Sequence, residues 1–245
     1  YNEMKGAFSS PDEVLEREIM NHLFPDTTYG CESGGDPKNI PDLTYENFLN
    51  FHRTYYHPSN SYIYLYGNMD MEEKLAFLDE HYLSHFDYLD VDSVIQEQKA
   101  FGACQDVTLE YPVAENEGEE DNTYLSYNMV VGNAADSQMA MAFEVLDYAL
   151  LSAPGAPLKQ ALLDVKAGKD VYGSYDDGIL QPYFTVIAKG SNPDRKEEFV
   201  SVIRQVLGDI VKNGIDRKAV EAGINYFEFR YREADFSSYP KGLMY

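Results

Sequence analysis

The sequence predicts an α+β protein of two related units, in each of which a sheet carries packed helices. Stretches with helical spacing of apolar residues alternate with short runs of β-branched and aromatic residues, as expected for mixed helices and strands. One order also recurs: SYIYLYGNMDMEEKLAFL and PYFTVIAKGSNPDRKEEFVSVI both place a strand, a turn and a helix around a glycine, Gly67 or Gly190. Chance likeness of two strand–turn–helix segments explains this repeat equally well.

The first unit, residues 1–93, predicts helices, a strand and a long loop. Ser10, followed by a proline, is typical of a helix start, and Pro25 ends that helix. Thr44 caps a second helix, YENFLNFHRTYY, and Asp70 starts a third, expected to end near residue 86. The run SYIYLYGN between them predicts a strand. The loop PDTTYGCESGGDPKNIPD is longer than a plain connection, which is typical of functional loops.

A stretch without sustained periodicity, residues 94–104, predicts a linker to a second unit over residues 105–245. The second unit begins with two expected strands, DVTLEYPV and NTYLSYNMVV, around the acidic loop AENEGEEDN. The elements expected after them are the helix DSQMAMAFEVLDYALLS, a short helix in APGAPLKQALLD, strands around VYGSYDD and PYFTVIAKG, and helices over about 194–213 and 216–233. We expect both units to be incomplete.

Charge and composition exclude some classes of function. The net charge is −23, from 42 acidic and 19 basic residues, which argues against a nucleic-acid-binding protein. An acidic surface attracts cationic partners at a distance, although such surfaces also serve solubility alone. No apolar run is long enough for a transmembrane helix and no secretory leader is visible. Cys31 and Cys104 form no metal or disulfide pattern, so we expect a reducing, cytoplasmic location.

Five histidines are the first candidates for a metal site. His81 and His85, in HYLSH, have the spacing of two ligands on one helical face. A hydrolytic zinc site needs a third ligand and a general base, and Ser84 stands where an inverted zinc motif has its glutamate. We therefore interpret the pair as a solvated helical pair. The others have no partner pattern and are interpreted as structural: His22, His52 and His57.

Three stretches carry a resemblance to a known family. They are NEMKGAFSSPDEVL, FPDTTYGCESGGDPKNIPDLTYENFLNFHRTYYHPSNSYIYLYGNM and LLSAPGAPLKQALLD. Together they resemble the presequence protease branch of the pitrilysin/insulinase-type zinc metallopeptidases, the inverzincins. The similarity extends over essentially the whole chain, and NEMKG, SGGDP and YHPSN are specific in combination.

The resemblance implies a zinc site shared between two parts of the parent protein. In that family two histidines of an H-x-x-E-H motif and a glutamate of the downstream N-E-M-K-G stretch bind zinc, and the glutamate of H-x-x-E-H is the general base. The downstream ligand matches Glu3, whereas H-x-x-E-H is absent from all 245 residues. We therefore expect an internal fragment that contains no catalytic residue of its own, with the histidine pair and the base upstream of Tyr1.

The same resemblance implies what the units do. Residues 1–93 resemble the C-terminal part of the catalytic peptidase domain, and residues 105–245 most of the following non-catalytic homologous domain. The expected parent is a zinc metalloendopeptidase that degrades unstructured peptides in a closed chamber, while the fragment itself is inactive and binds no zinc. Expected partners are peptides, cationic ones in particular, and the remaining domains. The alternative is a non-catalytic scaffold or partner subunit of the family. The sequence identifies no substrate-binding residue.

Overall fold

A three-stranded antiparallel sheet organises the second half of the chain. The computed structural model describes residues 1–113, 118–234, 238–239 and 243. Its strands are β1 (Thr123–Val130), β2 (Asp170–Asp176) and β3 (Tyr183–Ser191), in the order β1-β3-β2. The α+β class and these strands are therefore confirmed. Residues 114–117 of the expected acidic loop lie outside the described residues.

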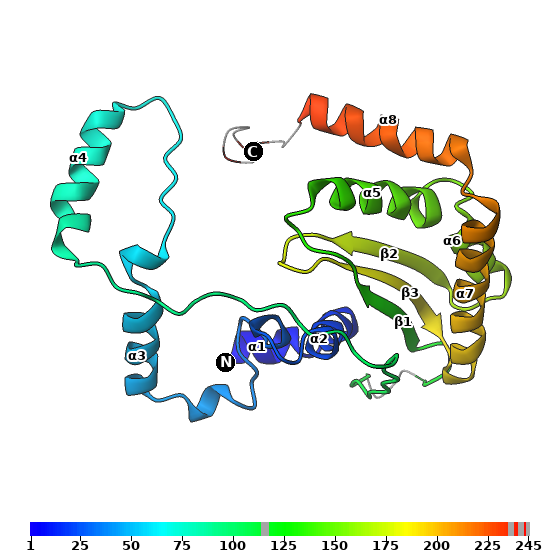
Figure 1. Ribbon diagram of the computed structural model, residues 1–245. Helices are drawn as coiled ribbons and strands as arrows, with labels where there is room; N and C mark the ends of the chain where they lie inside the picture. The colour runs from blue at the N-terminus through cyan, green and yellow to red at the C-terminus, as the bar shows by residue number, and fades with distance from the viewer. Residues whose placement is uncertain (114–117, 235–237, 240–242, 244–245) are drawn as a thin grey trace.

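One face of the sheet carries the larger core. The helices α5 (Ser137–Asp147), α6 (Pro157–Asp164) and α7 (Lys196–Asn213) lie on it, and α8 (Arg217–Glu233) packs on α5 (Figure 1). A π-helical turn, η5 (Tyr148–Ser152), continues α5. The buried side chains of this core are Leu125, Leu150, Leu151, Leu158, Leu162, Ala167, Val171, Phe184, Val186, Ala188, Phe199 and Ile203.

The opposite face of the sheet is covered by α2 (Pro11–Leu23). Ile19 of this helix and Phe24, the residue that follows its end, pack with Tyr183 and Ile187 of β3 in a second buried cluster. The ring of Phe24 is fully buried, with its centroid 6.2 Å from that of Tyr183. Because β3 is central and buried on both faces, its sequence YFTVIA is apolar almost without interruption.

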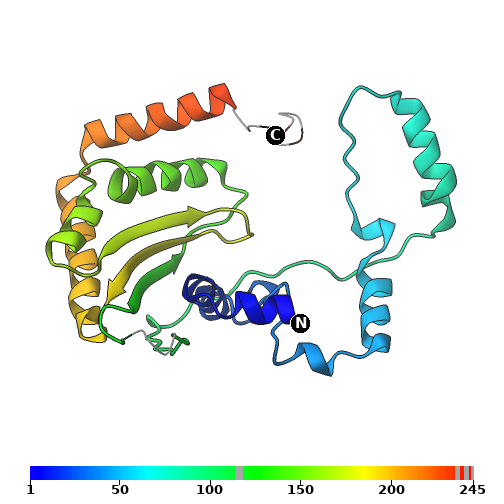
Figure 2. The ribbon, with the colours of Figure 1, turned by 180° about the vertical axis from the view of Figure 1, so that it is seen from behind.

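The remaining helices of the first half are α1 (Asn2–Ala7), α3 (Tyr45–Tyr55) and α4 (Met71–His81). Two side-chain caps form as predicted: Thr44 Oγ1 accepts a hydrogen bond from the Asn47 amide and Asp70 Oδ1 one from the Glu73 amide, each at 3.1 Å. Ser10 is the N-cap residue of α2, but its side chain makes no capping hydrogen bond. Short 3-10 turns complete the chain: η1 (Thr28–Gly30), η2 (Ile40–Asp42), η3 (Pro58–Asn60), η4 (Leu83–His85) and η6 (Pro193–Arg195). Figures 1 and 2 show α3 and α4 away from the sheet.

Three expected elements differ from the sequence prediction. Residues 61–66 are not in helix or strand, and neither are residues 106–113, because no neighbouring strand of the described chain pairs with either. The third helix ends at His81 instead of near residue 86, since Tyr82 leaves the helical conformation at φ −140° and ψ −67°. None of the helices in the described part of the chain has the length and hydrophobicity to cross a bilayer.

The stretch at 94–104 contains one buried side chain, that of Gln98. Its amide oxygen accepts a hydrogen bond from the Asp26 amide (2.9 Å), and its amide nitrogen donates one to the Asp26 carboxylate (2.7 Å). The Gln98 backbone also donates to the side chain of Gln181, in the β2–β3 turn. The division into units 1–93 and 105–245 stays a prediction, but this stretch is tied to elements on both sides of it.

Candidate functional site

Glu3 lies in the first turn of α1. Its side chain is exposed, and within the described chain no ion pair is formed by its carboxylate. A carboxylate in the first turn of a helix is favoured by the partial positive charge of the unpaired amides there. This position leaves the Glu3 side chain accessible from outside the chain.

Contacts from two later segments hold α1 in place. At Gly34, in the SGGDP stretch, an added Cβ would lie 2.5 Å from Met4 Sδ, so the absence of a side chain allows the loop to pass over α1. At the other end of α1, the guanidinium carbon of Arg17 lies 3.4 Å from the ring centroid of Phe8, a cation–π contact. The stretches NEMKG and SGGDP, which the sequence analysis singled out together, are thus neighbours in space.

The described residues do not fit a zinc ion by themselves. No group of three or more His, Cys, Asp or Glu side chains lies close enough to hold a metal in the described part of the chain. A catalytic zinc requires three protein ligands and an open position, whereas Glu3 supplies one carboxylate. Its role as a metal ligand therefore stays a prediction that depends on residues outside this chain.

The HYLSH pair does not have the expected helical geometry. His81 is the last residue of α4, where its ring lies 4.6 Å from that of Phe77. His85 belongs to the separate turn η4. Because the helix ends between them, the two rings are not presented one turn apart on a single helical face.

The remaining histidines make local contacts. His57 Nδ1 accepts a hydrogen bond from the Ser59 amide (3.2 Å) and so caps η3. The ring of His52 stacks on Tyr56 at 4.9 Å. His22 Nδ1 lies 2.8 Å from the backbone oxygen of Glu18. These contacts stabilise turns and helix ends, in agreement with a structural interpretation.

Asp147 is a titratable group that the sequence analysis missed. It ends α5, directly before η5, and its Oδ2 accepts a hydrogen bond from Ser152 Oγ at 3.3 Å. Its Oδ1 is buried and finds no hydrogen-bond partner among the described residues. Burial raises the pKa of this carboxyl group to about 6, against the smaller opposite effect of Ser152. The available signal was an aspartate inside the apolar run VLDYALL.

A groove lies between α5 and α8. It has a volume of about 480 Å³ and is lined by Met141, Glu144, Val145, Ile224, Phe227, Glu228, Tyr231 and Arg232. Tyr231 Oη donates to both oxygens of Glu144, at 3.0 and 2.8 Å. Burial and this carboxylate raise the pKa of Tyr231 to about 12. The other carboxylate of the groove, that of Glu228, pairs with Arg232 at 2.6 Å, so both carboxylates already have partners within the chain.

Comparisons with known proteins agree on one family. Residues 42–227 match the family described as "Peptidase M16 inactive domain". Over the whole chain the sequence is 49% identical to Protein HypA of Clostridium perfringens. It is 37% identical, over 99% of its length, to Presequence protease 1, chloroplastic/mitochondrial, of Arabidopsis thaliana. The chain spans about a quarter of the length of these relatives, 25% and 23% respectively.

Solved structures agree on the fold. A peptidase M16 inactive domain from Pseudomonas fluorescens superposes with a TM-score of 0.71 at 18% identity, over 99% of this chain and 56% of that one. An M16-like peptidase from Alicyclobacillus acidocaldarius gives 0.63 at 18% identity, over 95% of this chain and 54% of that one.

Proposed function

Since this chain belongs to the family of peptidase M16 inactive domains, we propose that it is part of a zinc metalloendopeptidase that degrades unstructured peptides. The observation that carries the proposal is its 37% identity, over almost its whole length, to a presequence protease. The proposal includes a longer natural protein, because the curated relatives are about four times as long as the matched segment.

The proposed roles divide along the chain. The family match covers residues 42–227 and carries the description "inactive domain", which supports a non-catalytic role for most of the sheet and its helices. Glu3 lies before this range, in the NEMKG stretch that resembles the zinc-binding segment of the family. We assign Glu3 as one zinc ligand, and the histidine ligands and the general base to polypeptide outside this chain.

The test is a pair of substitutions in the longer natural protein. Glu3→Gln replaces the carboxylate by a neutral amide of nearly equal size, and we expect bound zinc and peptide cleavage to fall together by at least tenfold. Glu13→Gln, at an exposed first-turn glutamate of α2, is the matched control and is expected to retain both. Normal zinc content and cleavage in Glu3→Gln, at an unchanged melting temperature, would refute the assignment of Glu3.

The 245-residue chain alone is expected to cleave no peptide and to hold no stoichiometric zinc, because one carboxylate is too few ligands. Elemental analysis of the purified chain checks this. If zinc is found, repeating the measurement on His81→Ala shows whether the HYLSH pair binds it. Metal-dependent cleavage by the chain would contradict the proposed division of roles.

The competing function is a scaffold or partner subunit without catalysis, which the description "inactive domain" also suits. The zinc content and the peptide cleavage of the longer wild-type protein distinguish the two functions, because a scaffold contains no zinc and cleaves no peptide. Both cysteines of the chain, Cys31 and Cys104, are exposed and unpaired, which supports the further proposal of a reducing, cytoplasmic location.

A further inference from the structure

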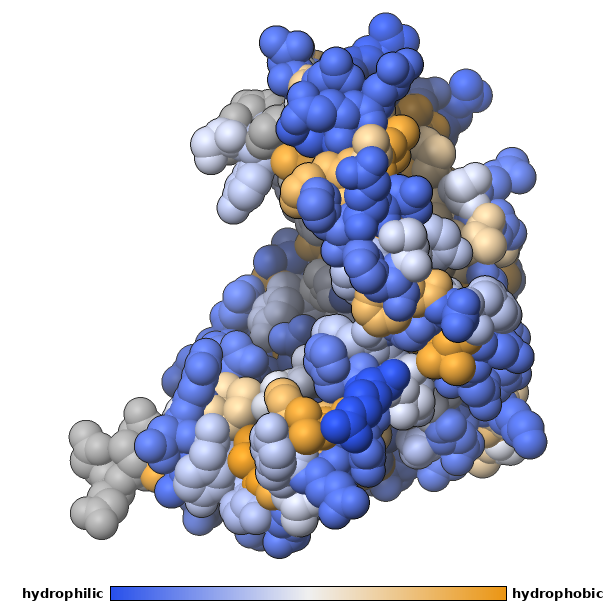
Figure 3. Space-filling view, turned by 90° about the vertical axis from the view of Figure 1, so that its left-hand side faces the viewer, coloured by the Kyte–Doolittle hydropathy of each residue, from blue (hydrophilic) through white to orange (hydrophobic). Residues whose placement is uncertain are grey.

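The loop between α2 and α3, residues 24–43, is longer than a plain connection, and the proposed function gives it no role. From Thr44 the chain continues into α3, which lies away from the sheet (Figures 1 and 2). Figure 3, which looks onto the side of α3 and α4, shows polar side chains around separate groups of hydrophobic ones. The contacts that fix the loop to the sheet are therefore to be sought at its other end, near α2.

The start of the loop is anchored to the turn between β2 and β3. Tyr29 Oη accepts a hydrogen bond from the Leu180 amide at 3.1 Å. The buried side chain of Gln98 accepts a hydrogen bond from the Asp26 amide and donates one to its carboxylate. The backbone of Gln98 is bonded in both directions to the side chain of Gln181. One glutamine, whose amide both donates and accepts, thus joins the loop to the turn.

The middle of the loop is closed on itself by local hydrogen bonds. The Gly35 amide donates to the Glu32 carbonyl group at 3.1 Å, and the Gly34 amide donates to the Glu32 carboxylate at 3.2 Å. A few residues later the Ile40 amide donates to the Asp36 carbonyl group at 2.9 Å. These bonds give the SGGDP stretch a defined shape where it meets α1.

Glycine is required at position 34 by the contact with α1 and not by the backbone. Gly35 has a φ of +88°, which favours glycine, whereas Gly34 is not among the glycines with positive φ. An added Cβ at Gly34 would lie 2.5 Å from Met4 Sδ and 2.7 Å from Met4 Cε. Non-bonded heavy atoms attract at about 3.5–4.0 Å, so a side chain at position 34 forces Met4 to turn away or the loop to lift from α1.

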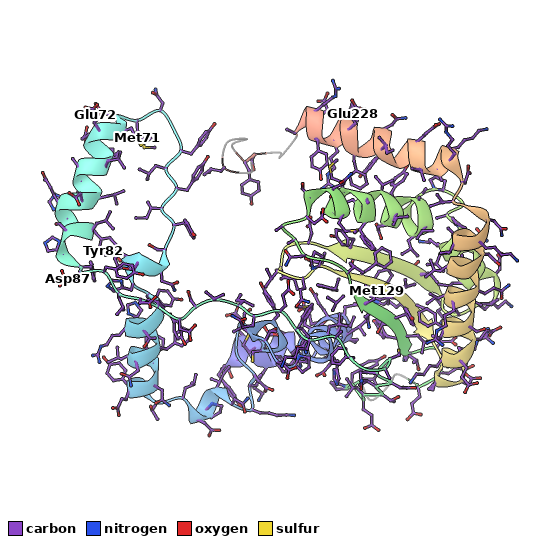
Figure 4. The ribbon with its side chains drawn as sticks, in the orientation of Figure 1. Met71, Glu72, Tyr82, Asp87, Met129 and Glu228 are labelled. Carbon is purple, nitrogen blue, oxygen red and sulfur yellow. The ribbon has the colours of Figure 1, made fainter. Side chains whose placement is uncertain are left out.

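The contact with Met4 sets the rotation of α1 about its own axis. α1 contains six residues, none of them buried, and its N-terminus has no side-chain cap, so the helix has little stability of its own. Met4 is partly buried, whereas Glu3 is exposed. Successive side chains of a helix point about 100° apart, so a helix held at Met4 presents Glu3 in one direction. Figure 4 shows α1 beside α2, on the opposite side of β1 (Met129) from α8 (Glu228).

We propose that residues 24–43 are a brace that carries the position of the β2–β3 turn to α1 and so sets the direction of Glu3. Gln98 and Gly34 are the positioning residues at the two ends of this brace. The contacts that form the brace require no metal. The inference rests on the proposed function only where it concerns zinc binding, so a structural test and a zinc test can fail separately.

The distance between two spin labels tests the brace in the 245-residue chain without any metal. Both natural cysteines, Cys31 and Cys104, are replaced by serine, and nitroxides are attached at Glu3→Cys and at Asp209→Cys, an exposed position of α7. Double electron–electron resonance is expected to give one narrow distance distribution, because the brace holds α1 in a single orientation relative to the sheet and its helices.

Gly34→Ala is expected to shift or broaden this distribution, because the added methyl group displaces Met4. In the Met4→Ala background the same change is expected to have no effect, since the Sδ and Cε atoms that the methyl group would meet are gone. Gly102→Ala, where no atom lies within 4 Å of the added Cβ, is the matched control. An unchanged distribution in Gly34→Ala, or an equal change in both backgrounds, would overturn the inference.

Gln98→Leu tests the other end of the brace. Leucine has a similar size but forms no hydrogen bond with Asp26, so the start of the loop is released from the β2–β3 turn and the distribution is expected to broaden. Gln96→Leu, at an exposed position of the same stretch, is the control and is expected to leave the distribution narrow. A narrow distribution in Gln98→Leu would show that the turn does not position α1.

The longer natural protein gives a second measurement, the zinc affinity in competition with a chelator. Gly34→Ala is expected to weaken zinc binding by at least about tenfold, as is typical when a residue that orients a ligand is lost. The same change in the Met4→Ala background is expected to leave zinc affinity unaltered. If Glu3→Gln loses zinc but Gly34→Ala binds it normally, the inference fails and the proposed function stands. If Glu3→Gln binds zinc normally, the proposed role of Glu3 fails, and the spin-label distances still decide whether the brace sets α1.

Discussion

Lys189 of the central strand β3 donates hydrogen bonds to both carboxylate oxygens of Asp12 in α2, at 3.0 and 2.8 Å. The ammonium group also lies 5.1 Å from the ring centroid of Tyr124. The hydrogen bonds to Asp12 and Tyr124 raise the pKa of Lys189. The side chains of Lys189 and Asp12 remain 43% and 54% exposed. The pair therefore orients α2 on the sheet but supplies little of the stability of that contact.

Asp12→Asn is expected to lower the free energy of unfolding by only about 0.2–1 kcal/mol, because an exposed ion pair is screened by water and salt. The loss should shrink further at about 1 M salt, where the Debye length is about 3 Å. Urea unfolding of the 245-residue chain at low and high salt measures it. Glu13→Gln, beside Asp12 but without an ion pair in the described structure, is the control. A salt-independent loss above about 2 kcal/mol would show that the pair stabilises the fold in another way.

Phe24→Ala is expected to lower the free energy of unfolding by about 3–5 kcal/mol, since it leaves a cavity under a fully buried ring. The ring packs edge-on against Tyr29 and Tyr183, so its loss also weakens the contact between α2 and the sheet. Phe48→Ala, at a ring that is 65% exposed on α3, is expected to change the same chain by less than about 0.5 kcal/mol. Equal effects of the two substitutions would mean that α2 does not pack on the sheet as described.

Asp147→Asn is expected to stabilise the protein at pH 8 and to have little effect at pH 4. The pKa of Asp147 is raised from 3.8 to about 6 in the folded state, so the folded protein holds this proton more tightly than the unfolded chain. The free energy of unfolding therefore falls as the pH rises from about 4 to about 6. Above that range the full cost of ionising the buried carboxyl group is present. Because the group is partly solvated, we expect a cost on the order of 1 kcal/mol.

The measurement for Asp147 is the difference in unfolding free energy between the wild-type protein and the Asn variant as a function of pH. Asp209→Asn, at an exposed position of α7, controls for the loss of one negative charge elsewhere on this acidic surface. A flat difference between pH 4 and pH 8 would show that Asp147 has no raised pKa in the folded protein.

The longer protein is expected to cleave basic peptides with a higher kcat/KM than acidic peptides of equal length. The chain carries a net charge of −23. A negatively charged surface raises the local concentration of positively charged peptides, and salt screens this attraction. The preference should therefore fade between about 0.05 and 1 M salt. Equal rates for matched peptides at low salt would reject electrostatic attraction.

Local sequence rules determined much of the secondary structure and the candidate ligand. Thr44 and Asp70 cap helices because each side chain reaches an amide three residues later, so a few neighbouring residues suffice to predict the helix start. The NEMKG stretch identified Glu3 through resemblance, which depends on residue identity and not on the fold. The sequence also placed β1, β2 and β3 through their β-branched and aromatic runs.

Only the tertiary structure decided which of these elements meet. It placed Gly34 over Met4, brought Asp12 to Lys189 and buried Asp147 beside η5. Such contacts depend on the path of the whole chain, which no local pattern specifies. The same reason explains YIYLY, residues 62–66, which has the composition of a strand but is not in the sheet that the described residues form. A strand forms only when neighbouring strands satisfy its backbone amides and carbonyl groups, whereas a capped helix satisfies most of its own.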